Sequence, residues 1–150
     1  MTAKRIFTIG YEGATQAEMI AVLKQSGVER VIDVRAVPLS RKLGFSKNVL
    51  AAGLREAGID YVHLKALGTP AEGREAARKG RWDVMARVYA AQLETPEAGA
   101  EAGRMIALAE EKPSALLCFE RDPAHCHRTP LPAAAHRGPS PTEHAKAFVF

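Results

Sequence analysis

The stretch RIFTIGYEGATQAEMIAVLKQSGVERVIDV, residues 5–34, decides the fold. It predicts a strand over residues 5–9, a helix over 16–25 that begins after Thr15, and a second strand over 30–34. A strand, a helix and a strand in this order form a parallel crossover unit, which is right-handed in nearly all proteins. The loops after the two strands then lie at the same edge of the sheet, where open α/β sheets bind their ligands.

The rest of the chain continues the alternation of strands and helices. Residues 36–46 contain Pro38 and Gly44 without periodicity, and we predict a long loop there. The further predicted elements are a helix over 47–57 capped by Ser46, a strand over 59–64, a helical region over 72–93 broken near Gly80, a helix over 96–111 and a buried strand over 115–119. The predicted fold class is therefore α/β, with three layers and a mostly parallel sheet of about four to five strands flanked by helices.

The chain has 150 residues, the size of one ordinary domain, and we predict a single α/β domain over residues 1–150. Four prolines interrupt residues 129–150, which we predict to be irregular. No apolar run approaches the ~20 residues of a membrane span, and the amino terminus has no signal-peptide pattern. With only two cysteines, both expected to be reduced, these features predict a cytoplasmic protein that does not enter a membrane.

Positive charge gathers in and around the predicted loop. The formal net charge of the whole chain is +4, and residues 35–47 alone carry four positive charges and no acidic residue. Guanidinium groups, hydroxyls and a helix amino terminus suit phosphate or carboxylate, so an oxyanion is the ligand that we predict. A solvated basic loop is the alternative. The residues concerned are Arg35, Arg41, Lys42 and Lys47, with hydroxyls at Ser40 and Ser46.

Polar or ionisable residues follow every predicted strand. Asp33 and Arg35 are two residues apart on an extended segment, so their side chains point the same way and either pair with each other or flank an anion. A hydrogen-bonded structural role is the ordinary explanation for any one of these residues, but four strand ends that meet at one edge favour a site. The other members of the set are Tyr11, Glu12, His63, Glu120 and Arg121.

The segment CFERDPAHCHR, residues 118–128, holds two thiols, two histidines, two carboxylates and two arginines. Its cysteines and histidines lack the paired spacing of structural zinc motifs, and we assign no metal site. Cys126 beside His127 and Arg128 has the electropositive surroundings that a reactive thiolate needs. Alternatively, Cys126 only packs, while Arg128 and Glu120 bind the ligand.

Four blocks in order resemble the family called domain of unknown function 488. They are TIGYEG at 8–13, IDVRAVPLSRKLGFSK at 32–47, GIDYVHLKALGTP at 58–70 and LLCFERDPAHCHR at 116–128. The resemblance supports the fold and locates the site, but it implies no reaction. The positions that match the family's motifs are Tyr11, Glu12, Gly13, Asp33, Arg35, Pro38, Ser40, Lys47, Tyr61, His63, Leu67, Gly68, Cys118, Glu120, Cys126, His127 and Arg128. Similar proteins continue past the last block into a helix and a short strand, and the proline-rich tail departs from that pattern.

Two functions compete. The first is an enzyme acting on a phosphorylated or nucleotide-like molecule at an arginine-rich pocket at the strand ends; the second is a non-catalytic module that binds nucleic acid or a phosphorylated partner. Cofactors and oligomeric state stay open. The predicted catalytic residues are Glu12, Asp33, Glu120 and Cys126, and the predicted substrate-binding residues are Tyr11, Arg35, Ser40, Arg41, Lys47, His63, His127 and Arg128.

Overall fold

The computed structural model describes residues 6–11, 13–118 and 142–144 of the chain. A parallel sheet lies at the centre, with strands in the order β3-β2-β4-β1-β5. The strands are β1 (Ile6–Gly10), β2 (Arg30–Asp33), β3 (Asp60–His63), β4 (Ser114–Cys118) and β5 (Thr142–His144). The helices are α1 (Gln16–Gln25), α2 (Lys47–Glu56), α3 (Ala71–Arg78), α4 (Trp82–Leu93) and α5 (Pro96–Glu111), with a 3-10 turn, η1, at Lys65–Leu67.

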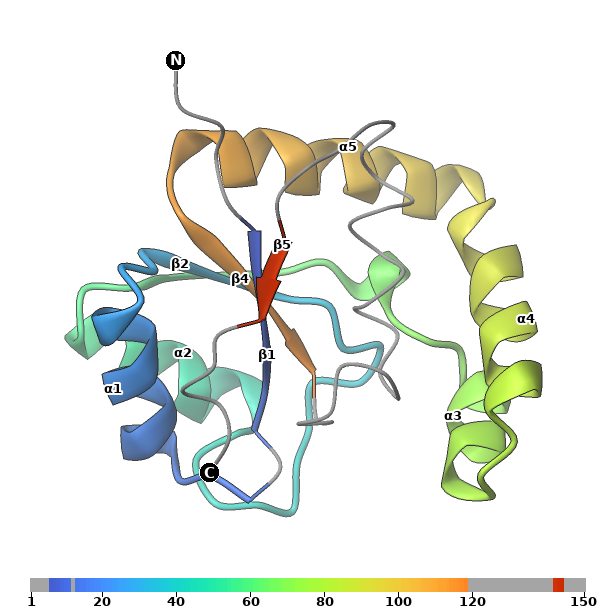
Figure 1. The fold of residues 1–150 in the computed structure, drawn as a ribbon, viewed down its shortest axis with the longest axis horizontal. Helices are drawn as coiled ribbons and strands as arrows, with labels where there is room; N and C mark the ends of the chain where they lie inside the picture. The colour runs from blue at the N-terminus through green and yellow to red at the C-terminus, as the bar shows by residue number, and fades with distance from the viewer. Residues whose placement is uncertain (1–5, 12, 119–141, 145–150) are drawn as a thin grey trace.

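Helices cover both faces of the sheet, as Figure 1 shows. One face packs against α1 and α2 through residues such as Met19, Leu23 and Leu54. The other face packs against α5, through Met105, and against Tyr89 of α4. Strand side chains alternate between the two cores because successive residues of a strand point to opposite faces. The prediction of a three-layer α/β fold with a mostly parallel sheet is confirmed.

The simplest crossover unit would place β1 and β2 side by side in the sheet, and the observed strand order differs from this. β4 pairs with both β1 and β2, so the first two strands of the chain are not neighbours. β4 is the strand from the apolar run near the end of the chain, and its Ala115, Leu116 and Leu117 are fully buried. An apolar run of this kind is typical of a strand that helices cover on both faces, and the centre of the sheet is such a place.

The helix boundaries follow local sequence signals. Thr15 and Glu18 form a capping box, in which Thr15 Oγ1 accepts from the Glu18 amide at 3.1 Å and Glu18 Oε1 accepts from the Thr15 amide at 2.8 Å. The predicted break of the helical region lies between α3 and α4, where Gly80 adopts φ +73°. Such a left-handed conformation is accessible to glycine without steric cost.

Two predictions need correction. Residues 142–144 lie in the stretch predicted to be irregular, yet they form β5, which pairs in parallel with β1. The prediction rested on the prolines of this stretch, but none of the three residues is a proline. Their pairing with β1 is a long-range contact that the local sequence does not indicate. Ser46 does occupy the N-cap position directly before α2, but its side chain makes no capping hydrogen bond to that helix.

Candidate functional site

A buried ion pair lies at the carboxyl end of β2. Arg35 donates from Nε to Asp33 Oδ1 at 2.8 Å and from Nη2 to Asp33 Oδ2 at 2.7 Å, while the Arg35 amide also donates to Oδ1 at 3.1 Å. The Asp33 side chain is fully buried, and Arg35 is 6% exposed. This two-pronged geometry is the strongest form of a carboxylate–guanidinium contact. Of the two interpretations of this pair, mutual pairing is what the structure describes.

The remaining donors of Arg35 tie the following loop to the sheet. Nη1 donates to the Phe45 carbonyl at 2.7 Å and to the Tyr11 hydroxyl at 3.3 Å. The Tyr11 ring stacks on Phe45 with 4.4 Å between centroids, and the guanidinium carbon lies 5.5 Å from the centre of the Tyr11 ring. Arg35 therefore joins the ends of β1 and β2 to the last turn of the loop before α2.

Tyr61 of β3 completes the shell around the carboxylate. Its hydroxyl donates to Asp33 Oδ2 at 2.5 Å across the β2–β3 pair. Burial raises the pKa of Tyr61 above the ordinary tyrosine range, and the negative charge of Asp33 raises it further. Tyr61 thus stays a neutral hydrogen-bond donor at physiological pH, and Asp33 accepts four hydrogen bonds from protein groups.

The Arg35 guanidinium keeps its charge despite its burial. Burial by itself lowers the pKa of Arg35, but the hydrogen bond and the negative charge of Asp33 outweigh it, so the pKa ends above the ordinary arginine value. The two charges compensate each other inside the protein. A buried pair of this kind holds its surroundings in one arrangement, because separating the partners would leave an unpaired buried charge.

His63 connects this pair to the surface. Its Nε2 lies 2.7 Å from the Arg35 carbonyl oxygen, and the ring is half-buried. A carbonyl oxygen only accepts, so Nε2 carries the proton in this contact and Nδ1 is left for another partner. His63 also lines a groove outside the pair.

This groove, which we call the lysine groove, is a hollow of about 720 Å³ beside the ends of β2 and β3. Lys47 and Lys65 are exposed on it, and among the described residues that line it there is no aspartate or glutamate. It also contains the first turn of α2, where the helix dipole places partial positive charge and no acidic side chain opposes it. Its other lining residues are Ala36, Val37, Pro38, Leu39, Ser46, Asn48, Val49 and His63.

The loop over residues 36–46 is braced from within. Ser46 Oγ accepts from the Ser40 amide at 3.0 Å and donates to the Ser40 carbonyl at 3.2 Å. Gln16 of α1 donates to the Gly44 carbonyl at 2.6 Å. The prediction of a long loop without regular structure is confirmed, and these contacts keep one wall of the lysine groove in place.

The structure brings together only part of the predicted site. Tyr11, Asp33, Arg35 and His63 meet in one connected set, and Lys47 and His63 share the lysine groove. Arg41 is exposed and lines neither this groove nor the neighbouring one. Ser40 supports Ser46. Glu12, Glu120, Cys126, His127 and Arg128 lie outside the described residues, so their predicted roles stay predictions.

Sequence reasoning missed several residues of this region. Phe45 and Lys65 were not proposed as site residues, and Tyr61 was noted only through the family resemblance. Tyr61 lies two residues before His63 on the same strand, so its side chain points to the same face; this periodicity was the available signal. Phe45 contributes a backbone carbonyl and a ring that stacks on Tyr11, and no local sequence signal indicates either contact.

The fold and this site define a class: a three-layer α/β protein with a buried ion pair and a basic groove at the ends of its parallel strands. Within that class, the model of the family described as domain of unknown function DUF488 matches residues 15–134. The chain belongs to this family, as the resemblance of its four sequence blocks implies. No curated protein and no solved structure matches the chain.

Two further findings concern ligands and membranes. Within the described part of the chain, no helix is long and apolar enough to cross a membrane. No group of three or more histidine, cysteine, aspartate or glutamate side chains there is arranged to hold a metal ion. The cytoplasmic location predicted from the sequence stays a prediction.

Proposed function

We propose that this protein binds a phosphorylated or nucleotide-like molecule in the lysine groove and acts on it as an enzyme. The observation that carries the proposal is the charge of the groove: Lys47, Lys65 and the amino terminus of α2 face it without an acidic side chain among the described lining residues. Cations and helix amino termini are the protein groups that stabilise phosphate. A ligand of this class gains these contacts only in the folded protein.

Apolar side chains at the same groove support a ligand that has an apolar part in addition to its phosphate. Val37, Leu39 and Val49 line it and are 45%, 70% and 55% exposed. Exposed aliphatic side chains beside cations suit a molecule with both an anionic group and a flat or apolar part. A nucleotide or a similar phosphorylated compound combines the two.

In this proposal Asp33 and Arg35 position the groove and do not touch the ligand. Asp33 is fully buried and accepts four hydrogen bonds, which leaves it poorly placed to exchange a proton with a substrate. Arg35 spends Nε, Nη1 and Nη2 on protein acceptors. Acid or base chemistry is thereby assigned to Glu12 or Glu120, and Cys126 is the proposed nucleophile.

A thermal-shift screen of nucleotides, sugar phosphates and short oligonucleotides tests the binding. A ligand that binds only the native state raises the melting temperature. We expect the shift to shrink in Lys47→Gln and to persist in Lys24→Gln, which removes an exposed lysine of α1 that does not line the groove. If no anion shifts the melting temperature of the wild-type protein, the proposal is wrong.

Two substitutions, tested in the same thermal-shift screen and in an activity assay, distinguish an enzyme from a binding module. For an enzyme, we expect Glu120→Gln and Cys126→Ser to keep the melting temperature and the ligand shift but to lose turnover. A module for nucleic acid would tolerate both changes, would prefer oligonucleotides and would lose affinity steeply as salt rises.

A further inference from the structure

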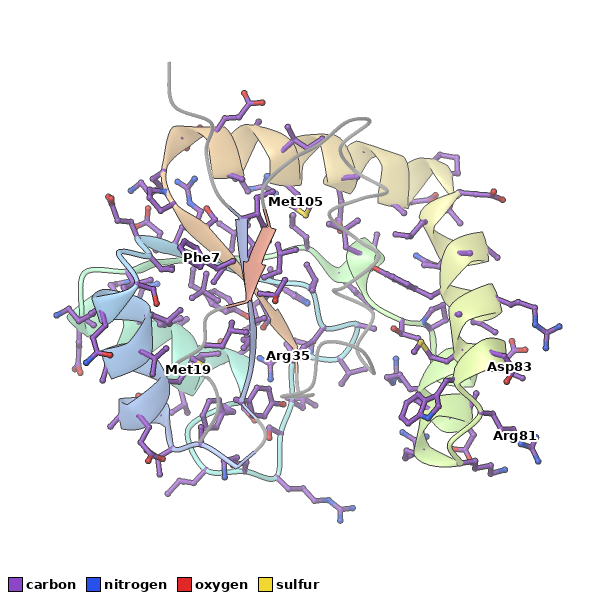
Figure 2. All side chains as sticks on the ribbon, viewed as in Figure 1. Phe7, Met19, Arg35, Arg81, Asp83 and Met105 are labelled. Atoms are coloured by element: carbon purple, nitrogen blue, oxygen red, sulfur yellow. The ribbon has the colours of Figure 1, made fainter. Side chains whose placement is uncertain are left out.

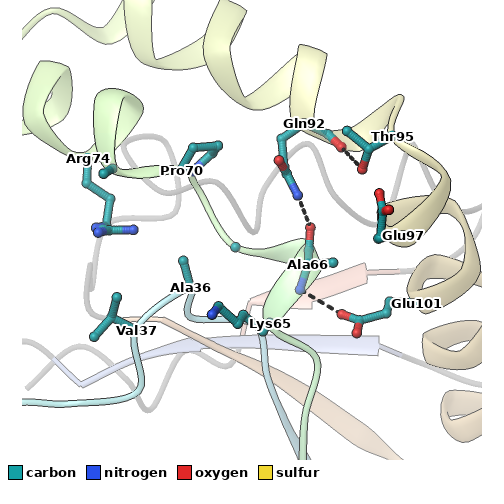
Figure 3. A pocket seen from close by; sticks show the side chains of 12 residues that line it. Ala36, Val37, Lys65, Ala66, Pro70, Arg74, Gln92, Thr95, Glu97 and Glu101 are labelled. Carbon is teal, nitrogen blue, oxygen red and sulfur yellow. Dashed lines mark hydrogen bonds between the residues drawn. The ribbon is translucent and has the colours of Figure 1, made fainter.

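A second groove adjoins the lysine groove. It encloses about 570 Å³ between η1, the start of α3 and the region where α4 passes into α5. Figure 3 shows Arg74 entering it from α3 on one side, while Glu97 and Glu101 stand on α5 at the opposite side. The groove therefore has a basic end and an acidic end.

Arg74 is anchored at the basic end. Its Nη1 donates to the Thr69 carbonyl at 2.9 Å, and its side chain is half-buried. Among the described residues, Nε and Nη2 of this guanidinium have no hydrogen-bond partner. A guanidinium that is held at one nitrogen presents the planar fork that carboxylates and phosphates accept, and two of its nitrogens donate to no described residue.

The acidic end is partly committed to the protein. Glu101 Oε1 accepts from the Ala66 amide at 2.7 Å, which holds η1 against α5. Glu97 lies in the first turn of α5, where the helix dipole favours a negative charge. These carboxylates repel an anion from their own end and leave the basic end as its place.

The two grooves share a wall. Ala36, Val37 and Lys65 line both of them, so a molecule in one groove lies next to the other. Gly68 packs directly against this wall, since a Cβ atom at that position would lie 2.2 Å from the Ala36 amide nitrogen. Lys65 is thus an exposed cation on the boundary between the two grooves.

We propose that the ligand carries two separated anionic groups, one in the lysine groove at Lys47 and one in the second groove at Arg74, with Lys65 between them. This inference rests on the proposed function, because it assigns the chemical class of the molecule bound there. A bisphosphate, or a phosphate that also bears a carboxylate, has the required chemistry.

Paired probes test the proposal by calorimetric titration of the full chain. AMP is compared with adenosine 3′,5′-bisphosphate, and fructose 6-phosphate with fructose 1,6-bisphosphate. We expect at least one bisphosphate to bind about tenfold more tightly than its monophosphate, the ratio that one further charge-assisted contact provides. In Arg74→Gln that ratio should fall to about one, with the affinity for the monophosphate unchanged.

Two controls make the result decisive. Arg87→Gln removes an exposed arginine of α4 that lines neither groove, and it should keep the full ratio. Thermal melts of each variant confirm folding. If a monophosphate binds through Lys47 but bisphosphates gain nothing, or Arg74→Gln leaves the gain intact, the two-anion inference is wrong while the proposed function stands. If wild-type protein binds no probe of either kind, both fail.

Discussion

Asp33 and Arg35 hold each other through two parallel hydrogen bonds of 2.8 and 2.7 Å, although both lie inside the protein. Figure 2 shows Arg35 beside the lower half of β1, among the side chains of the core. From there it reaches the Phe45 carbonyl and the Tyr11 hydroxyl. A salt bridge between the last residue of β2 and a residue two positions further along the chain thus ties down the loop that forms the lysine groove.

Removing the charge of one partner of this pair should destabilise the fold. Asp33→Asn leaves the Arg35 guanidinium buried without a counter-charge, and we expect a loss of about 3–5 kcal/mol in the free energy of unfolding. For a chain of this size the melting temperature should drop on the order of 10 °C. Chemical denaturation measures the loss.

A double variant shows whether the loss of stability comes from the unpaired charge or from the changed shape of the side chains. Asp33→Leu combined with Arg35→Met removes both charges, and it should be more stable than Asp33→Asn, because no unpaired charge remains. A double variant less stable than the single one would show that the shape of these side chains, not their charge, stabilises the fold.

Alkaline pH should destabilise the protein through two phenols, the half-buried Tyr61 and the buried Tyr89. Burial raises the pKa of Tyr61 and of Tyr89 above the ordinary value of 10.0. A group whose pKa is higher in the folded state stabilises fully below its unfolded pKa and loses that contribution as the pH rises through the folded pKa. Stability should therefore fall from about pH 10 upward, as followed by urea unfolding at several pH values.

Replacement of the phenols checks the assignment. Tyr61→Phe should flatten the alkaline slope, and at neutral pH it should cost about 1.5–3 kcal/mol, because Asp33 loses a charge-assisted hydrogen bond. Tyr89→Phe loses the bond to the Leu67 carbonyl at 2.8 Å and should flatten the slope too. An unchanged slope in both variants would contradict the assigned cause.

Two glycines should respond to alanine in opposite ways. Gly68→Ala forces a methyl group to within 2.2 Å of the Ala36 backbone, which lines the lysine groove. We therefore expect a lower melting temperature and weaker anion binding in that groove. Gly103→Ala adds a Cβ atom inside α5 that would meet no atom of another described element within 4 Å, and it should stabilise the protein by about 1 kcal/mol. Thermal melts of both variants give the comparison, and equal shifts would refute the close contact at Gly68.

The loop over residues 36–46 should open when its link to α1 is removed. Gln16→Ala deletes the hydrogen bond from Nε2 to the Gly44 carbonyl. We expect faster cleavage within the loop by trypsin at low concentration, at Arg41 or Lys42, because local opening exposes the backbone. Gln25→Ala, at the other end of the same helix, serves as the control. Equal cleavage rates would show that Gln16 does not restrain the loop.

Much of the architecture could be predicted because its signals are local. The capping pair Thr15 and Glu18, the helical spacing of apolar residues and the stop at Gly80 each act within a few residues of chain. The pairing of Asp33 with Arg35 was accessible for the same reason, since residues two apart on a strand share a face. The strand β5 was missed because only its pairing with β1 defines it.

The amino-acid sequence alone determined the alternation of strands and helices, the edge of the sheet where polar side chains gather, and the basic character of the loop after β2. Tertiary structure decided which cations face a groove: Arg35 turned inward to Asp33, Tyr11 and Phe45, while Lys47, Lys65 and Arg74 came to line neighbouring hollows. The physical reason is that local periodicity fixes the face a side chain points to. Its partners depend on which distant segments pack there.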